Sequence, residues 1–431
     1  MATQQMAGLA PAGQSRPGYE LRIVLLLGLA YGFAFYDRMT MAFLSPFVAK
    51  DFALNNAQIG LLSSGLSLTW ALGACLIGYW SDKMGVRKPF LLTFLLIYSV
   101  CSVLSGLSPS FGPLLATRVL MGAVEGPFLP ICLAFIAAAS PDHRRGLNSG
   151  IVQNVFGALL GNALAPILVV WIAIHWGWRE SFYTAGLPGL ILFFLVWKFV
   201  DEPPRMAAPP LADPATAEAG LGRKLAGGAI EILSMLKERN IALCAAMSPL
   251  LIGMLILTAT FFPVYLTKVR GYSPETMSYI MFVTGFCPAI GAVILTGLSD
   301  RIGRKIPMII GATMTALSPF AAVYFQGSVA MLTVLMFIGT LGVGMMPLYM
   351  GVVPAETLKT RNIAAAMGVV VMIGELTGGV IAPPVSGWLA DVTTLDAPLL
   401  IAGGMSLLAG IVCLFIKETN PAVLARREAA A

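Results

Sequence analysis

A succession of long apolar runs constrains the fold of this chain more than any other sequence feature. The chain has 431 residues, of which 58% are hydrophobic and 11% are charged, and this composition excludes an ordinary soluble globule and a disordered chain. A helix needs about 20 predominantly apolar residues to span a bilayer. Runs of this kind occur at 21–46, 57–80, 89–108, 113–139, 147–174, 181–200, 241–266, 274–298, 306–325, 328–353, 362–389 and 397–416. The sequence therefore predicts an all-α membrane protein with twelve transmembrane helices.

One long polar segment divides these runs into two groups of six. Residues 201–240 open with Asp-Glu-Pro-Pro and continue through Ala- and Pro-rich sequence, and we interpret residues 223–239 as an amphipathic surface helix. The expected parts of the chain are an N-terminal tail (1–20), an N-terminal six-helix half (21–200), a central loop (201–240), a C-terminal six-helix half (241–417) and a C-terminal tail (418–431).

The basic residues of the short loops predict the orientation in the membrane. The loops on one side hold Lys83, Arg87, Lys88, Arg144, Arg145, Arg301, Arg304, Lys305, Lys359 and Arg361, and those on the other side hold Lys50, Arg179, Lys268 and Arg270. By the positive-inside rule, both termini and the central loop are cytoplasmic. We expect a monomer in a bacterial-type inner (plasma) membrane. The net charge of +6 then reflects contact with anionic lipid, not with nucleic acid.

Four ionisable residues lie inside apolar runs: Asp37 and Arg38 in the first, Arg118 and Glu125 in the fourth. Each charged residue at a helix centre costs roughly 2.5–3.5 kcal/mol on insertion scales. Arg118 and Glu125 are two helical turns apart and share one face, and the helical rise places Asp37 and Arg38 at a depth between them. We expect one cluster with zero net charge. Such groups mark substrate or proton pathways, and a static structural ion-pair cluster is the alternative interpretation.

Two short segments with related sequences lie at equivalent places in the two halves. Residues 78–88 (GYWSDKMGVRK) join the second and third runs, and residues 297–305 (GLSDRIGRK) join the eighth and ninth. Both resemble the signature loop of the major facilitator superfamily. The resemblance implies two pseudo-repeated six-helix halves with a substrate site between them. It also implies that a set of loop residues gates the cytoplasmic side, namely Asp82, Gly85, Arg87, Asp300 and Arg304.

Residues 118–130 (RVLMGAVEGPFLP), together with Asp37-Arg38, resemble the anion:cation symporter family, which includes carriers of sugar acids, phthalate and glutamate. The resemblance implies proton-coupled symport of a small organic anion by alternating access. The family's first-span pattern is usually Asn-Tyr-x-Asp-Arg, but residues 34–38 read AFYDR, which lacks the Asn and shifts the Tyr to position 36. Trp70 stands where sugar-acid members often have Tyr. These changes replace polar groups with aromatic surface and predict a less hydroxylated anion.

The chemistry of the cluster follows from its side chains. Arg38 and Arg118 are the predicted substrate-binding cations, because a planar guanidinium matches a carboxylate. Asp37 and Glu125 are the predicted proton-coupling acids, since each can neutralise an arginine until protonation frees that arginine for the substrate. Further candidates are Tyr36, Trp70, Gln153 and Asn154 for substrate binding and Glu375 for proton coupling.

Two other functions stay open at this point. An efflux carrier for an amphipathic lipid or drug, of the Spinster or multidrug type, also places Asp-Arg in the first helix and Arg and Glu in the fourth. A receptor or scaffold with this fold is the third possibility, although the twin loops and the charge cluster argue against it. The sequence shows no Walker loop, and its six cysteines have no metal-ligand spacing. We expect no enzymatic activity, no catalytic or metal-binding residues and no cofactor, with the proton as coupling ion.

Overall fold

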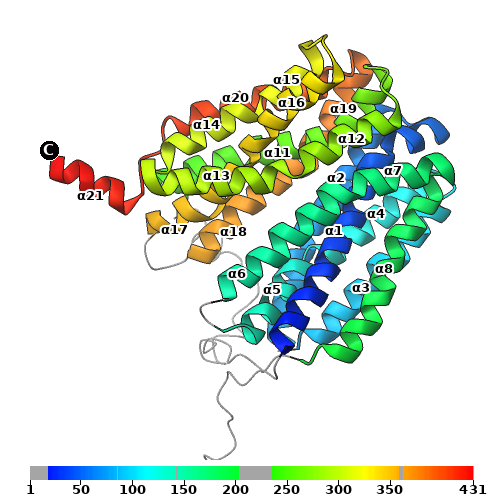
Figure 1. Ribbon diagram of the computed structural model, residues 1–431, viewed down its shortest axis with the longest axis horizontal. Coiled ribbons are helices and arrows are strands. Elements are labelled where there is room, and N and C mark those ends of the chain that lie inside the picture. The colour runs from blue at the N-terminus through cyan, green and yellow to red at the C-terminus, as the bar shows by residue number, and fades with distance from the viewer. Residues whose placement is uncertain (1–17, 85, 142–143, 203–234, 359–362, 431) are drawn as a thin grey trace, which may run out of the picture.

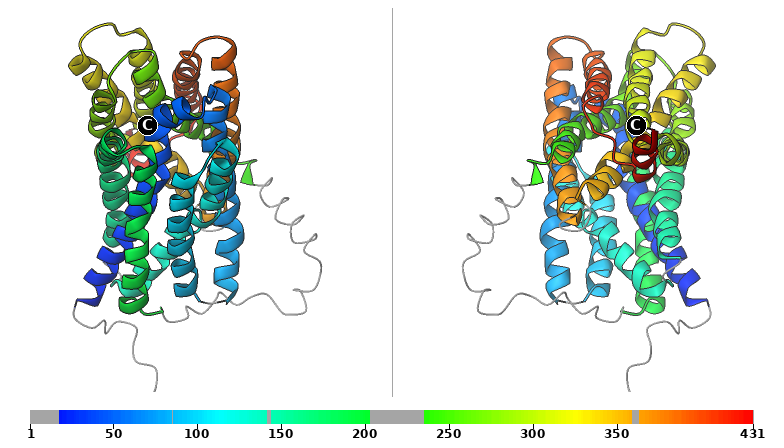
Figure 2. Two further views of the ribbon diagram at one scale, coloured as in Figure 1. Left: turned by 90° about the vertical axis from the view of Figure 1, so that its right-hand side faces the viewer. Right: turned by 90° about the vertical axis from the view of Figure 1, so that its left-hand side faces the viewer.

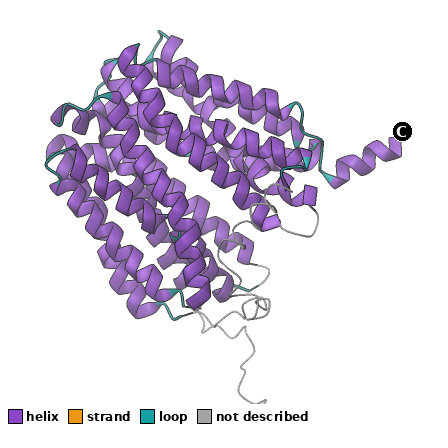
Figure 3. Cartoon of the chain, turned by 180° about the vertical axis from the view of Figure 1, so that it is seen from behind, coloured by secondary structure: helices purple, strands orange, loops and turns teal. Residues whose placement is uncertain are grey.

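The computed structural model describes residues 18–84, 86–141, 144–202, 235–358 and 363–430, and the regular elements in these ranges are helices (Figure 3). Ten of the described helices are long and apolar enough to cross a membrane. Helix α20 (Ala397–Cys413) is apolar but shorter, and α2 (Asn56–Met84) is long but is not among the ten. The fold class is therefore as predicted, and the count of twelve transmembrane helices stays a prediction.

The N-terminal half runs from α1 to α8. Its elements are α1 (Tyr19–Asp51), α2 (Asn56–Met84), α3 (Lys88–Leu107), α4 (Phe111–Glu125), α5 (Phe128–Ala139), α6 (Arg145–Gly150), the π-helical η1 (Ile151–Leu164), α7 (Ala165–His175) and α8 (Trp178–Phe199). Helix α1 passes through Pro46 and ends at Asp51, beyond the apolar run at 21–46. A proline inside a long apolar helix is tolerated where neighbouring groups satisfy the freed backbone.

The C-terminal half runs from α11 to α20, followed by one terminal helix. Its elements are α11 (Arg239–Lys268), α12 (Pro274–Gly285), α13 (Cys287–Ile302), α14 (Lys305–Thr315), α15 (Leu317–Tyr324), α16 (Val329–Leu341), η2 (Gly342–Met345), η3 (Leu348–Val352), α17 (Val353–Leu358), α18 (Ile363–Gly374), η4 (Glu375–Ile381), α19 (Ala382–Val392), α20 (Ala397–Cys413) and α21 (Pro421–Ala430). The expected surface helix at 223–239 falls mostly on residues 203–234, outside the described part of the chain.

The two halves repeat one pattern of helix pairing. In the N-terminal half α1 packs on η1, α2 on α4 and α3 on α8; in the C-terminal half α11 packs on η4, α13 on η2 and α14 on α20. When the six predicted spans of the N-terminal half are aligned in order with the six of the C-terminal half, each N-terminal pair corresponds to the C-terminal pair in the same position of this list. In the α2–α4 pair, a Cβ added at Gly122 or Gly126 would overlap the carbonyl groups of Leu66 and Trp70. These glycines therefore permit the close backbone approach that their positions on one helix face predict.

The two halves meet at one end of the bundle and diverge at the other (Figures 1 and 2). We name the ends after α1: the Tyr19 end, where the described chain begins, and the Asp51 end. The inter-half contacts include those of α2 with α19 and η4, of α12 with α7 and η1, and of α1 with α11. Towards the Asp51 end, Asp391 of α19 accepts hydrogen bonds from the backbone N–H groups of Asn56 (2.8 Å) and Ala57 (2.9 Å) at the start of α2. The bundle is thus closed at its Asp51 end.

Candidate functional site

A cavity of about 820 Å³ lies between the two halves, and we call it the central cavity. Its N-terminal-half wall comes from α1, α2 and η1, and its C-terminal-half wall comes mainly from α13, from the segments between η2 and α17, and from α18 and η4. The polar or aromatic side chains of the first wall are Tyr31, Phe35, Trp70, Gln153, Asn154 and Asn162. The larger side chains of the second wall are Met346, Met350, Met367, Met372 and Glu375.

A smaller cavity of about 40 Å³ lies beside the central cavity and holds the first half of the charge cluster. Arg38 and Glu125 both line it, and Tyr31, Phe35 and Trp70 line both cavities. The guanidinium carbon of Arg38 lies 5.2 Å from the ring centroid of Trp70, which is a cation–π distance. Both carboxyl oxygens of Glu125 are buried and accept no hydrogen bond from any described residue. A cation and an acid therefore border one small space next to the central cavity.

The second half of the cluster is sealed inside the N-terminal half. Asp37 and Arg118 have exposed fractions of 0% and 1%, and neither lines the central cavity. Ser102 donates a hydrogen bond to Oδ1 of Asp37 (2.7 Å), and Nη2 of Arg118 donates one to Ser105 (2.9 Å). Oδ2 of Asp37 and two guanidinium nitrogens of Arg118 have no hydrogen-bond partner among the described residues. Helix α3 thus supplies two serines to this pair.

The four charged side chains lie near one another but are not joined by direct ion pairs. Asp37 is within electrostatic range of Arg118, and Glu125 is within range of Arg38. Within the described ranges, however, no ion pair of 4.0 Å or less joins any of the four. Instead, serines of α3 hydrogen-bond to Asp37 and Arg118, and the guanidinium of Arg118 lies 5.1 Å from the Phe182 ring.

The other predicted substrate residues divide into two groups. Trp70, Gln153 and Asn154 line the central cavity, as expected for groups that contact a substrate. Tyr36 does not line it: this side chain is 4% exposed and packs in the apolar core. The reason is the helical register, because Phe35 takes the cavity-facing position on α1. Sequence reasoning missed Tyr31, although residues 31, 35 and 38 recur at helical spacing on one face.

Glu375 opens the π-helical segment η4 and faces the central cavity from the C-terminal half. Its Oε2 atom is buried without a hydrogen-bond partner among the described residues. It is within electrostatic range of Arg38 across the cavity. The acid predicted as a second proton site is therefore at the cavity wall, opposite the cation of the N-terminal half.

The predicted gating residues lie in two loops at the Tyr19 end. Gly85 and the side chain of Asp82 are outside the described part of the structure. In the C-terminal half, Arg304, which directly precedes α14, forms an ion pair with Asp300 on α13 and another with Glu356 (2.8 Å) on α17. Both partners belong to the same half, so this loop is linked internally in the conformation described here.

An acid in the segment that follows α8, and another in the segment that follows α20, binds the backbone of the neighbouring loop. Glu202 accepts hydrogen bonds from the N–H groups of Arg87 (2.6 Å) and Lys88 (2.8 Å). Glu418 accepts them from the N–H groups of Arg304 (2.8 Å) and Lys305 (3.2 Å). Partial burial acts to raise the pKa of Glu418, but these and two further backbone N–H donors outweigh it and hold the pKa below its ordinary value.

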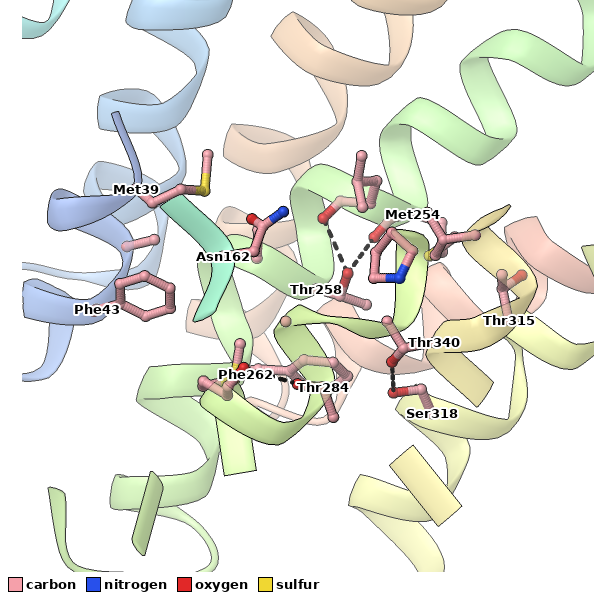
Figure 4. Close-up of a pocket in the computed structure, with 17 residues that line it drawn as sticks. Met39, Phe43, Asn162, Met254, Thr258, Phe262, Thr284, Thr315, Ser318 and Thr340 are labelled. Carbon is pink, nitrogen blue, oxygen red and sulfur yellow. Dashed lines mark hydrogen bonds between the residues drawn. The ribbon is translucent and has the colours of Figure 1, made fainter. Parts of the chain in front are cut away.

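A second cavity, of about 110 Å³, lies on the Asp51 side of the central cavity (Figure 4). Asn162 lines both cavities and therefore stands between them. The hydroxyl groups around the second cavity come from Thr258, Thr284, Thr315, Ser318 and Thr340. Thr258, Thr284 and Thr315 donate to carbonyl groups of their own helices, and Ser318 lies 3.4 Å from Thr340. These hydroxyls are occupied with the protein itself, unlike the acids near the central cavity.

The helix pairing and the site between the halves define a membrane carrier, and comparison with known proteins identifies its class. The family model of the Major Facilitator Superfamily matches residues 27–283 and 241–431. The chain belongs to the Major Facilitator Superfamily. Its members are transporters and not enzymes, so the fold, the family and the absence of enzymatic activity predicted from the sequence are confirmed.

The individual relatives of the chain include named transporters. It is 27% identical over 404 residues to the hexuronate transporter of Bacillus subtilis, which covers 91% of this chain and 93% of the relative. It is 27% identical over 301 residues to the gallate transporter of Pseudomonas putida, which covers 66% of each. The fold is also that of a solved bacterial homologue of the human lysosomal transporter Spinster, in an inward-facing and unoccupied conformation, with a TM-score of 0.76. The alignment covers 93% of this chain and 98% of the homologue, and the two sequences are 19% identical.

Proposed function

We propose that this protein is a proton-coupled symporter that carries a small carboxylate across a bacterial-type inner membrane by alternating access. The observation that supports this best is the small cavity shared by Arg38 and Glu125. Arg38 is a permanent cation without an ion pair of 4.0 Å or less among the described residues, and a guanidinium binds a carboxylate with two parallel hydrogen bonds. Glu125 faces the same space as an acid without a hydrogen-bond donor.

Coupling follows from the neighbourhood of these two groups. An ionised Glu125 attracts Arg38 and repels an incoming carboxylate, whereas a protonated Glu125 does neither. The proton and the anion therefore bind cooperatively, and each raises the affinity for the other by the same factor. Asp37 and Arg118, buried behind this pair, keep the interior of the N-terminal half near zero net charge. Glu375 is the second acid that a proton can reach from the central cavity.

The predicted orientation in the membrane assigns this conformation to the inward-facing state of the transport cycle. With both termini in the cytoplasm, the closed Asp51 end faces outward and the central cavity faces the cytoplasm. The hydrogen bonds from Asn56 and Ala57 to Asp391 then hold the inward-facing state. The outward-facing state requires these bonds to break and the two halves to close at the Tyr19 end, where we assign the gating role to the loops that contain Asp82 and Asp300.

The names of the relatives support a carboxylate over a lipid. Hexuronates and gallate are both small carboxylic acids, and the two carriers named for them align with this chain. The Spinster homologue is under 25% identical and supports the fold alone. Efflux of an amphipathic lipid or drug is therefore not favoured.

Transport by purified protein in lipid vesicles tests this proposal. A panel of labelled carboxylates should include at least one that accumulates against its gradient when the outside is made acidic. Arg38→Ala should abolish that uptake and the counterflow exchange of the same substrate. Arg426→Ala, which removes an exposed arginine of the terminal helix α21, is the matched control and should transport normally. Uptake by Arg38→Ala at the control rate would refute the proposed anion site.

A further inference from the structure

The two walls of the central cavity differ in chemistry, and this difference bears on the class of anion. Within the described chain, Glu375 is the one side chain of the C-terminal-half wall that contains a nitrogen or oxygen atom. The rest of that wall consists of Ala, Gly, Pro, Val and four Met side chains. The facing wall presents the rings of Tyr31, Phe35 and Trp70 beside the amides of Gln153, Asn154 and Asn162. A ligand between the walls therefore contacts an almost wholly apolar surface on one face and aromatic rings with a few amides on the other.

The volumes assign the parts of the ligand to the two cavities. An apolar cavity of roughly 150 Å³ accommodates a benzene ring, and one water molecule needs roughly 10–15 Å³. The small cavity next to Arg38, at about 40 Å³, holds a carboxylate group but no ring. The central cavity, at about 820 Å³, holds a ring easily. The charged group of the ligand therefore enters beside Arg38 and its body stays between the aromatic and methionine walls.

We infer that the anion is an aromatic monocarboxylate, with its carboxylate at Arg38 and its ring between Trp70 and the methionines that include Met350. This inference rests on the proposed function and narrows its substrate. Flat rings pack well on aromatic side chains, and thioether sulfur makes favourable contacts with aromatic rings. Methionine also adapts its shape to rings with different substituents. The geometry thus matches a planar apolar body with one charged end.

The same walls select against the two nearest alternatives. A polyhydroxylated sugar acid would bury several hydroxyl groups against the C-terminal-half wall, and each unpaired group there costs roughly 5- to 150-fold in affinity. A dicarboxylate would place its second carboxylate near Glu375. Two like charges would then meet, or one of the acids would have to take up a proton, and both outcomes weaken binding. Glu375 is therefore a specificity residue for a single negative charge.

Calorimetric titration of the purified full-length protein with three probes tests the inference. The probes are benzoate, glucuronate, which is a hydroxylated monocarboxylate, and terephthalate, which is an aromatic dicarboxylate. We expect benzoate to bind at least tenfold more tightly than either of the other two. Trp70→Ala should weaken benzoate binding about tenfold, whereas Trp197→Ala, an exposed tryptophan on α8, should leave it unchanged.

The role of Glu375 has its own matched comparison. Glu375→Gln should strengthen terephthalate binding at least fivefold and leave the glucuronate affinity weak, because it removes one charge and adds no partner for several hydroxyls. Glu275→Gln, an exposed acid at the start of α12, is the control. An unchanged ratio of terephthalate to benzoate affinity in Glu375→Gln would overturn the specificity role.

The failures of the inference and of the proposed function are distinguishable. If glucuronate binds as tightly as benzoate and Arg38→Ala abolishes both, the aromatic class is wrong and the carboxylate site stands. If terephthalate binds more tightly than benzoate to the unaltered protein, the preference for one charge is wrong. If none of the three probes binds, the aromatic class is wrong, and uptake of the other labelled carboxylates then decides the proposed function.

Discussion

The N-terminal half presents aromatic rings to the central cavity, with Arg38 and Glu125 directly behind them, whereas the C-terminal half presents four methionines and Glu375. The backbones of the two halves nevertheless pair their helices in the same pattern. The repeated pairing specifies the fold, and a few side chains on each wall specify the chemistry. We interpret the N-terminal wall as the part that recognises charge and the C-terminal wall as the part that recognises the body of the ligand.

The buried Arg118 should show the largest effect of this asymmetry on stability. Arg118→Leu leaves Asp37 without the buried cation beside it and removes one of the two cations near Glu125, and breaking a buried charge arrangement in this way costs about 3–5 kcal/mol. Unfolding of the purified protein by denaturant measures the loss. The double variant Arg118→Leu/Asp37→Leu should recover part of it, because it removes one of the abandoned charges. The expected loss in the free energy of unfolding is about 3–5 kcal/mol. If Arg118→Leu lost less than about 1 kcal/mol, the cluster would not need this cation for stability.

Loss of the acid in the small cavity should separate coupling from binding. Glu125→Gln imitates the protonated state, so counterflow exchange should persist while uptake driven by a pH gradient falls at least tenfold. Vesicles loaded with substrate measure both rates in one preparation. The control is Glu275→Gln. Gradient-driven uptake that survives in Glu125→Gln would move the coupling proton to Asp37 or Glu375.

Much of this organisation is visible in the sequence, because its causes are local. The apolar runs predict the helices, the twin loops predict the family, and the spacing of Arg118 and Glu125 predicts a shared face. The side chains that separate the charges are not predictable in the same way. Ser102 and Ser105 are two of several serines on α3, and only the packing of α3 against α1 and α4 shows that they contact Asp37 and Arg118.

Register explains the remaining differences between expectation and structure. A one-residue step turns a helix by about 100°, so the resemblance to a family with Tyr in the first span led to Tyr36, while the cavity takes Tyr31 and Phe35. The methionine wall comes from several segments, among them η3 and α18, and no periodic pattern in the sequence joins Met350 with Met367. A wall built from separate helices becomes apparent only when those helices are placed together.

The contact that closes the Asp51 end should have an intermediate effect. Asp391→Ala removes three hydrogen bonds across the halves, and we expect the equilibrium to shift about tenfold away from the conformation described here. The labelling rate of a cysteine introduced at Gln153, in a cysteine-free background, reports access to the central cavity and should fall. Asp51→Ala is the control, because Asp51 pairs with Arg179 inside one half. Equal labelling rates in the Asp391 and Asp51 variants would show that this contact does not hold the state.

The smallest effect should come from the hydrogen bonds that Glu202 and Glu418 accept from the loop backbone, a contact that both halves contain. Glu418→Gln and Glu202→Gln each weaken the hydrogen bonds to a loop backbone, and each should lower the Tm by less than about 4 °C. For Glu418 the folded-state pKa lies below its unfolded value, so its contribution is present at neutral pH and is lost as the pH falls through the folded pKa. The Tm difference between the unaltered protein and Glu418→Gln should shrink accordingly in acid. Glu238→Gln, an exposed acid before α11, is the control, and a difference that grows in acid would contradict this account.

The most direct measurement compares one charged ligand with its uncharged counterpart. The ratio of the Kd of benzamide to the Kd of benzoate measures how strongly the site prefers a carboxylate to an uncharged amide. If Arg38 reads the charge and the C-terminal wall reads the ring, this ratio should be at least about 30 in the unaltered protein, close to 1 in Arg38→Ala and still large in Met350→Ala, which should weaken both ligands alike. A ratio in Arg38→Ala that equals that of the unaltered protein would contradict the assignment of charge recognition to the N-terminal half.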